Sequence, residues 1–164
     1  MLGFLRRKKK EKYGPLVYLS EPTILYHTRT ERAILKILEE RLNSNNFVVP
    51  SDYGLKTTDH LIPEAEIFVA IAVLGKFTSL VVREIEIARK QGKKIYTLDV
   101  AKKDDEVLYN FEEGGIPEYI EWLTPEETQS LYAAFRGEDF SGFMKFFWGG
   151  TGRRDGSYPK TEKG

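Results

Sequence analysis

Glu84 occupies a position where a carboxylate is costly unless something compensates its charge. A helix that begins near Ser79 turns by about 100° per residue. This rotation gathers the apolar side chains on one side, with Glu84 in the middle of them: Leu80, Val81, Ile87 and Ala88, with Ile85 at the edge. A carboxylate that faces a sheet must be paired or must line a cleft. Desolvation there raises a carboxyl pKa and strengthens the attraction of the charged form for a developing positive charge. The alternative is a structural strut, in which Glu84 bonds to nearby backbone or pairs with Lys76.

Polar residues also follow the predicted strands, where α/β proteins bind ligands. Open parallel sheets bind at the carboxyl ends of their strands. The segments after Leu19, Val49 and Leu74 supply the candidate binding residues: Ser20, Glu21, Tyr26, Asp52, Lys76, Thr78 and Ser79. None of these segments carries a Gly-x-Gly-x-x-Gly dinucleotide fingerprint or a Gly-Lys-Ser/Thr phosphate loop. The sequence therefore disfavours a dinucleotide-dependent dehydrogenase and a P-loop NTPase.

The sequence gives little support for a metal or cofactor site. It contains no cysteine, which excludes disulfides and thiolate zinc sites. Its two histidines, His27 and His60, are not spaced as ligands on one element. A metal would have to be held by scattered carboxylates. We therefore expect neither a metal nor a cofactor.

The elements that must position these residues alternate between strands and helices. Short apolar runs predict strands at 16–20, 47–49, 67–74 and 94–98, with a less regular fifth strand at 118–123. Helical spacing predicts helices at 29–42 and 79–91, and a short one near Leu61. Thr124-Pro125 followed by Glu127 has the pattern of a helix start, and this helix is expected to end near Arg136. Asp99 to Gly115 is predicted to be an acidic loop.

This alternation implies right-handed crossovers and a parallel sheet. We predict a flavodoxin-like three-layer α/β sandwich with a five-stranded, mainly parallel sheet in the order 2-1-3-4-5. Residues 67–73 should be central, because a nearly unbroken apolar run is covered on both faces. A chain of 164 residues suits one domain. The predicted divisions are a basic flexible arm at 1–13, a single domain at 14–148 and a disordered tail at 149–164.

Composition is that of a globular, charge-rich protein. Hydrophobic residues make up 41% and charged residues 30%, and the formal net charge is zero. No apolar run reaches the roughly 18 residues of a membrane span. The N-terminal charges follow a short apolar stretch, which reverses the order of a secretory signal. We therefore expect a cytoplasmic protein, and the high Lys and Glu content is compatible with a thermophile.

The chain ends carry two further features whose interpretation stays open. Six cations crowd the first twelve residues: Arg6, Arg7, Lys8, Lys9, Lys10 and Lys12. Residues 6–12 are thus a candidate contact with nucleic acid or an anionic surface, or else a solvated tail. The aromatic segment Phe143 to Trp148 either packs on the core or offers a patch to a partner. A homo-oligomer also stays open.

Several segments resemble the nucleoside 2-deoxyribosyltransferase-like family over about residues 16–98. Leu16 to Pro22 is similar to the opening strand and loop of that family, and Val48-Val-Pro-Ser-Asp52 is similar to its second strand. Residues 66–74, Glu84-Ile-Glu-Ile-Ala88 and Gly92 to Tyr96 resemble its third strand, its Glu-x-x-x-Ala helix and the next strand.

Ser79-Leu-Val-Val-Arg-Glu84 also resembles the Ser-x-x-x-x-Glu segment of TIR domains, a flavodoxin-like group that includes NAD glycohydrolases. In both families this Glu attacks or stabilises the anomeric carbon of a ribosyl group. Both resemblances therefore imply that role for Glu84, since a nearby carboxylate is what an oxocarbenium-like transition state needs.

These resemblances imply a nucleoside, nucleotide or NAD-like ligand and cleavage or transfer at an N-glycosidic bond. Ser20, Tyr26 and Asp52 would then bind sugar or base. Thr78 and Ser79 would offer hydroxyls and helix-N-terminal amides to a phosphate or sugar oxygen. One alternative is a non-catalytic nucleotide sensor or protein-interaction module of the TIR-like type. A protein tethered to nucleic acid or a membrane surface by its arm is another.

Overall fold

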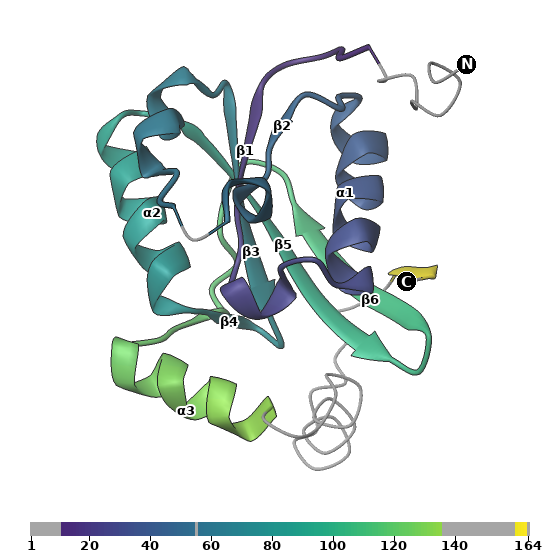
Figure 1. The fold of residues 1–164 in the computed structure, drawn as a ribbon, viewed down its shortest axis with the longest axis vertical. Helices are drawn as coiled ribbons and strands as arrows, with labels where there is room; N and C mark the ends of the chain where they lie inside the picture. Colours follow the sequence, from purple (N-terminus) through teal and green to yellow (C-terminus); the bar gives the residue numbers. More distant parts are fainter. Residues whose placement is uncertain (1–10, 55, 136–159, 164) are drawn as a thin grey trace, which may run out of the picture.

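The computed structural model of the protein describes residues 11–54, 56–135 and 160–163. It is a mixed α/β fold built on one sheet, in which neighbouring strands follow the order β2-β1-β3-β5-β6-β8 (Figure 1). Four neighbouring strands are parallel: β2 (Phe47–Val48), β1 (Val17–Ser20), β3 (Ile67–Val73) and β5 (Lys94–Lys103). Two antiparallel strands extend one edge: β6 (Glu106–Glu112) and β8 (Lys160–Lys163). The apolar run of β3 lies inside the sheet, between β1 and β5.

Two amphipathic helices cover opposite faces of the sheet (Figure 1). The first, α1 (Arg29–Leu42), begins where the Thr28 hydroxyl accepts the N–H of Glu31 and ends at a left-handed Asn43. It packs Ile34 and Leu38 against side chains of β1, β3 and β5. The second, α2 (Ser79–Lys90), packs Val81 and Ile85 against the other face. The helices expected at 29–42 and 79–91 are confirmed, and their polar faces point to solvent.

A third helix and three short 3-10 helices complete the described chain. The third helix, α3 (Pro125–Phe135), starts in a capping box: Glu127 Oε1 accepts the N–H of Thr124, and the Thr124 hydroxyl accepts the N–H of Glu127. This confirms the predicted helix start. The 3-10 helices are η2 (Thr23–Leu25), η3 (Pro50–Tyr53) and η4 (Asp59–Glu64). The segment near Leu61, expected to be a short helix, is η4.

The segment expected to be an acidic loop, Asp99 to Gly115, is largely a β-hairpin. β5 continues to Lys103, and a two-residue turn with a left-handed Asp104 leads into β6. Alternate residues of β6, Val107 and Tyr109, are buried against the α1 face. The prediction was wrong because most of the charges, apart from the buried Asp99, stand on turn positions or on positions that are at least partly exposed, where they leave the two-residue apolar alternation intact.

The fifth predicted strand is also corrected. Only β7 (Glu121–Trp122) forms within 118–123, and it pairs in parallel with β4 (Lys76–Phe77) rather than with β5. The edge of β5 is instead taken by β6, which reaches it through the short hairpin. Because β6 follows β5 after a two-residue turn, it pairs with β5 directly. A strand from 118–123 could pair with that edge of β5 only by displacing β6.

The ends of the predicted domain differ from expectation where they are described. Residues 11–13 are attached to the end of α1, since the Tyr13 N–H and the Glu11 carbonyl both bond to Asn45 and the Tyr13 hydroxyl donates to Glu39. Residues 160–163, expected in a disordered tail, pair as β8 with β6. The cations at 6–10 and the aromatic segment 143–148 lie outside the described residues. None of the helices that the structure describes has the length and apolar character needed to cross a membrane.

Candidate functional site

The sheet topology places a reversal of strand order at the carboxyl end of β1. From β1 the chain turns through α1 to β2 on one side, while β3 pairs with β1 on the other side and leads into α2 on the opposite face. In open α/β sheets this reversal of strand order is where ligands bind. Ser20, the last residue of β1, and Glu21, which follows it, stand at this point and are fully buried.

Glu84 reaches the same point from the second turn of α2. Its side chain is 4% exposed. The Ser20 hydroxyl donates to Oε1 at 2.7 Å, and the Tyr18 hydroxyl donates to Oε2 at 3.0 Å. The Tyr18 oxygen also lies 2.6 Å from the Thr58 hydroxyl. Because Tyr18 has a single proton and gives it to Glu84, Thr58 must donate in turn to Tyr18.

This network holds a carboxylate in a place that disfavours its charge. Burial raises the pKa of Glu84, while the hydrogen bonds from Ser20 and Tyr18 lower it and leave a net increase. The pKa of the Tyr18 hydroxyl is also raised, by burial and by the negative charge of Glu84. Tyr18 therefore stays protonated and remains a donor. A carboxylate that accepts a hydroxyl on each oxygen in a dry setting interacts strongly with any positive charge that forms beside it.

A second acidic centre lies beside the first, on the α1 side. No N–H or O–H of the described residues donates to either oxygen of Glu21. Burial and the neighbouring carboxyl of Glu31 raise the pKa of Glu21 to about 10, so Glu21 is neutral at physiological pH and can donate its own proton to Glu31. Burial alone would raise the pKa of Glu31. The neighbouring Glu21 carboxyl, the Ser51 hydroxyl and the hydrogen bond from the N–H of His27 outweigh burial and lower it.

Tyr26 and Asp52 belong to the same region. Tyr26 is half-buried just after η2, and burial together with the charges of Glu21 and Glu84 raises its pKa to about 12. The next residue, His27, has a left-handed backbone, with φ of 62°. This conformation is uncommon outside glycine, and strained backbone conformations of this kind cluster at functional sites. Asp52 is exposed in η3, and its charge adds to the rise in the Glu21 pKa. The structure thus brings Ser20, Glu21, Tyr26, Asp52 and Glu84 together.

Lys76, Thr78 and Ser79 lie in a different setting. The Lys76 ammonium pairs with Glu121 at 2.6 Å, so the expected alternative of a Lys76–Glu84 strut is wrong. The Ser79 N–H donates to the Thr128 hydroxyl of α3 at 2.9 Å and is not available to a phosphate in this arrangement. Thr78 precedes α2 with its hydroxyl buried and without a described partner. The role in ligand binding proposed for these three residues stays a prediction.

Three residues of the site were missed by the sequence analysis: Tyr18, Thr58 and Glu31. A fourth, Ser51, lies in the segment after Val49 that was expected to supply binding residues, but it was not chosen as a candidate. Tyr18 lies between Val17 and Leu19, so the sequence indicates only an apolar strand residue and not a role for its hydroxyl. Glu31 carries a signal, because Thr28-x-x-Glu31 matches the capping-box pattern, although its carboxylate accepts the N–H of His27 rather than that of Thr28. That pattern accounts for a helix start and gives no indication that the carboxylate also belongs to the site. The contact between α1 and the loop after β2 that brings Ser51 to Glu31 has no sequence signature.

The described residues contain no group of three or more His, Asp or Glu side chains arranged to hold a metal ion. Comparison of the chain with protein-family models, with curated proteins and with solved structures finds no match. The site is therefore interpreted from its own geometry.

Proposed function

We propose that the protein binds a nucleoside, nucleotide or NAD-like compound at the end of β1 and cleaves or transfers its N-glycosidic bond. One observation supports this most: Glu84 is a buried carboxylate whose two oxygens each accept a side-chain hydroxyl at the strand ends. Ser20 and Tyr18 orient Glu84 and keep its charged form accessible. The ligand would contact Glu84 from the side of Tyr26 and Asp52.

The reaction needs a negative charge at one place. When the bond between the anomeric carbon and the base nitrogen breaks, its electron pair leaves with the base, which takes up a proton. Positive charge then develops on the sugar ring. Glu84 stabilises that charge or adds to the anomeric carbon, and water or an acceptor base completes hydrolysis or transfer. Because Glu21 is neutral, it adds no second negative charge beside Glu84.

The arrangement of elements supports the finer fold assignment. The order β2-β1-β3-β5, with α1 and α2 on opposite faces, is what a flavodoxin-like three-layer sandwich predicts for its first four strands. The likeness to nucleoside 2-deoxyribosyltransferases and TIR domains, both of which use a Glu on the corresponding helix, agrees with the position of Glu84.

A second candidate function is a non-catalytic nucleotide sensor. The observation that favours it is the exposure of Glu84, only 4%, together with the occupation of both of its oxygens. A carboxylate in that state can fix the shape of a binding site without touching the sugar. The two candidates differ in whether Glu84 reaches the anomeric carbon once a ligand is bound.

The test is to incubate the protein with NAD, nucleoside monophosphates or deoxynucleosides and to measure the free base released by chromatography. We expect Glu84→Gln to reduce release by about a hundredfold or more, because Gln keeps the shape but carries no charge. Glu86→Gln is the matched control, since Glu86 is exposed on the same helix. Circular dichroism and calorimetric binding should show the fold and ligand binding retained in both variants. Release that is equal in wild type and Glu84→Gln contradicts the catalytic role, and binding without release from any substrate favours the sensor.

A further inference from the structure

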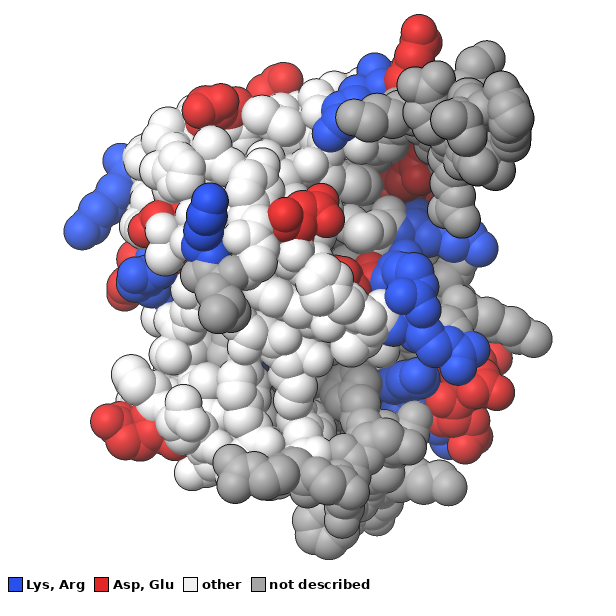
Figure 2. All heavy atoms as spheres, in the orientation of Figure 1, with Lys and Arg blue, Asp and Glu red and all other residues white. Residues whose placement is uncertain are grey.

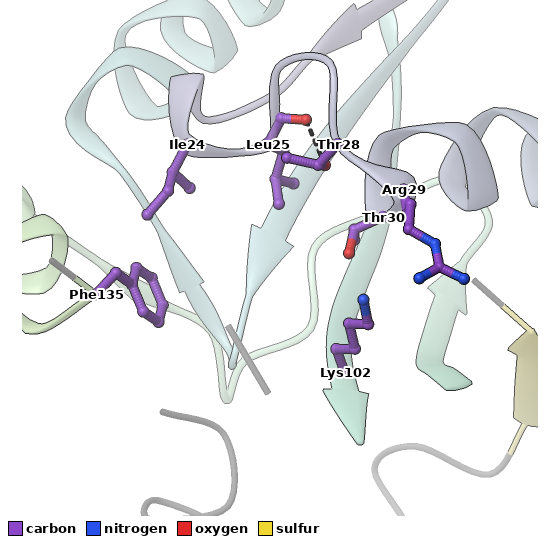
Figure 3. Close-up of a pocket in the computed structure, with 7 residues that line it drawn as sticks. All are labelled: Ile24, Leu25, Thr28, Arg29, Thr30, Lys102 and Phe135. Carbon is purple, nitrogen blue, oxygen red and sulfur yellow. Dashed lines mark hydrogen bonds between the residues drawn. The ribbon is translucent and has the colours of Figure 1, made fainter. Parts of the chain in front are cut away.

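A cavity of about 260 Å³ lies on the α1 side of the sheet, between η2, the start of α1, the end of β5 and the end of α3 (Figure 3). Its lining residues fall into two groups. The polar group is Thr28, Arg29, Thr30 and Lys102, and the apolar group is Ile24, Leu25 and Phe135. None of the catalytic candidates at the end of β1 is among them. This cavity is therefore distinct from the Glu84 network and has no assigned use.

The first turn of α1 opens toward this cavity with free hydrogen-bond donors. The Thr28 hydroxyl is engaged, since it donates to the Leu25 carbonyl at 2.6 Å and accepts the N–H of Glu31 at 3.1 Å. Within the described chain, nothing accepts the backbone N–H of Arg29 or of Thr30. α1 has 14 residues, so its dipole adds positive potential at this end. Free amides at the start of a helix bind anions.

Thr30 is the independent sign of a ligand. The residue is 3% exposed, yet its hydroxyl forms no hydrogen bond with any residue that the structure describes. In Figure 3 this hydroxyl points away from the helix toward the ammonium of Lys102, with no bond between them. The side chain is thus almost wholly buried, and its hydroxyl oxygen is open only toward the cavity that Thr30 lines. A ligand atom in the cavity can accept its hydrogen bond.

Charge on this side of the molecule favours an anion. Lys102 is half-buried and Arg29 is exposed, and no carboxylate of the described residues pairs with either. Figure 2 shows Lys and Arg side chains gathered on the side where α1 lies, and α1 exposes Arg29, Arg32 and Lys36 there. The nearest acid in the first turn, Glu31, is turned toward Glu21 and Ser51 instead. The positive groups at the cavity are thus not neutralised by Glu31.

We infer that this cavity is a binding site for a phosphate monoester with a small apolar body. The phosphate would accept the N–H groups of Arg29 and Thr30 and the Thr30 hydroxyl, and would pair with Lys102 and Arg29, since charge-assisted bonds to phosphate are strong. Ile24, Leu25 and Phe135 would contact the apolar body. The size of the cavity suits a compact ligand rather than a dinucleotide. This inference does not rest on the proposed function.

The experiment is calorimetric titration of the full chain with phenyl phosphate, inorganic phosphate and phenol at fixed salt. We expect saturable binding of phenyl phosphate, weaker binding of inorganic phosphate and no detectable binding of phenol. Lys102→Met, which keeps the length of the side chain but removes its charge, should weaken phenyl phosphate binding by about tenfold or more. Thr30→Val, which removes the hydroxyl at nearly constant shape, should weaken it several-fold.

Lys103→Met is the matched control, because Lys103 is the exposed neighbour of Lys102 and is not among the lining residues. It should leave the affinity within about twofold. Three results would overturn the inference: no saturable binding of phenyl phosphate, equal losses in Lys102→Met and Lys103→Met, or affinity unchanged in both Lys102→Met and Thr30→Val. Base release plays no part in this titration. A failure of the phosphate-site inference can therefore be told apart from a failure of the proposed function.

Discussion

Buried carboxyl groups at two places along the same edge of the sheet are held in different ways. Asp99 of β5 accepts the backbone N–H of Gly75 at 2.9 Å and the Tyr119 hydroxyl at 2.8 Å, and Asn110 donates in turn to Tyr119. These bonds tie the left-handed turn at Leu74 and Gly75 to the sheet. At the end of β1, by contrast, Glu84 accepts only side-chain hydroxyls, and Glu21 accepts nothing from the described residues.

The difference separates scaffold from site. A carboxylate that binds a backbone N–H fixes the path of the chain, and a satisfied polar group of this kind stabilises one fold. Glu21 and Glu84 form no hydrogen bond with a backbone group of the described residues, and the environment raises the pKa of both. Groups with such perturbed pKa values, gathered at strand ends, mark functional sites more often than structural ones. We therefore propose that Asp99 belongs to the scaffold and that the Glu84 region binds a ligand.

The largest effect on stability is expected for Asp99→Ala. It leaves the Gly75 N–H and the Tyr119 hydroxyl without their acceptor, at a cost of about 1–3 kcal/mol for each buried donor. Urea unfolding should show a loss on the order of 2–5 kcal/mol. Any base release per folded molecule should be unchanged. A loss below about 1 kcal/mol would contradict the scaffold assignment.

Glu21→Gln should change how stability depends on pH. The unfolded carboxyl ionises near its ordinary pKa of 4.5, but the folded one ionises near 10. Between these values the folded state holds one more proton than the unfolded state, so wild-type stability falls as pH rises. The raised pKa of Glu84 acts in the same direction, whereas the lowered pKa of Glu31 acts only below about pH 4.5.

Gln cannot ionise, so the variant should lose less stability than wild type between pH 5 and pH 9. The difference should grow by about 1.4 kcal/mol for each pH unit across this range, measured by urea unfolding at both pH values. Glu86→Gln is again the exposed control and should follow wild type. Parallel pH profiles for Glu21→Gln and wild type would show that Glu21 ionises normally in the folded state.

The sequence predicted the scaffold better than the site, for physical reasons. α1 and α2 follow from apolar spacing and end signals carried by adjacent residues, and the start of α3 follows from Thr124, Pro125 and Glu127. The unbroken apolar run of β3 identified an inner strand. The hairpin β5–β6 was missed because the acidic character of 99–115 was given more weight than the alternation of Val107 and Tyr109.

Glu84 could be singled out because a charge in an apolar stripe is a local anomaly. Its partners could not, since Tyr18 and Ser20 meet it only through the pairing of β1 with the sheet and the packing of α2. The Glu21–Glu31 contact likewise joins a loop and a helix that the sequence places independently. The pairing of Lys76 with Glu121 depends on the β4–β7 pair, which spacing along the chain does not indicate.

The smallest effect is expected for Lys76→Ala. The Lys76–Glu121 pair is partly exposed, with Glu121 at 57%, so its loss should cost at most about 1 kcal/mol and should shrink with added salt. Thermal unfolding at low and high salt measures this. A change in ligand affinity would contradict our view that Lys76 is apart from the site and would restore its predicted binding role.

The most direct test of the account is the map of amide chemical shifts when deoxyadenosine, which carries no phosphate, is titrated into the labelled protein. The account predicts that the largest shifts fall on Ser20, Glu21 and Glu84, while Gly75 and Asp99 stay unchanged. Shifts centred on Gly75 and Asp99 would contradict it. So would the absence of shifts at saturating deoxyadenosine and, in a second titration, at saturating NAD.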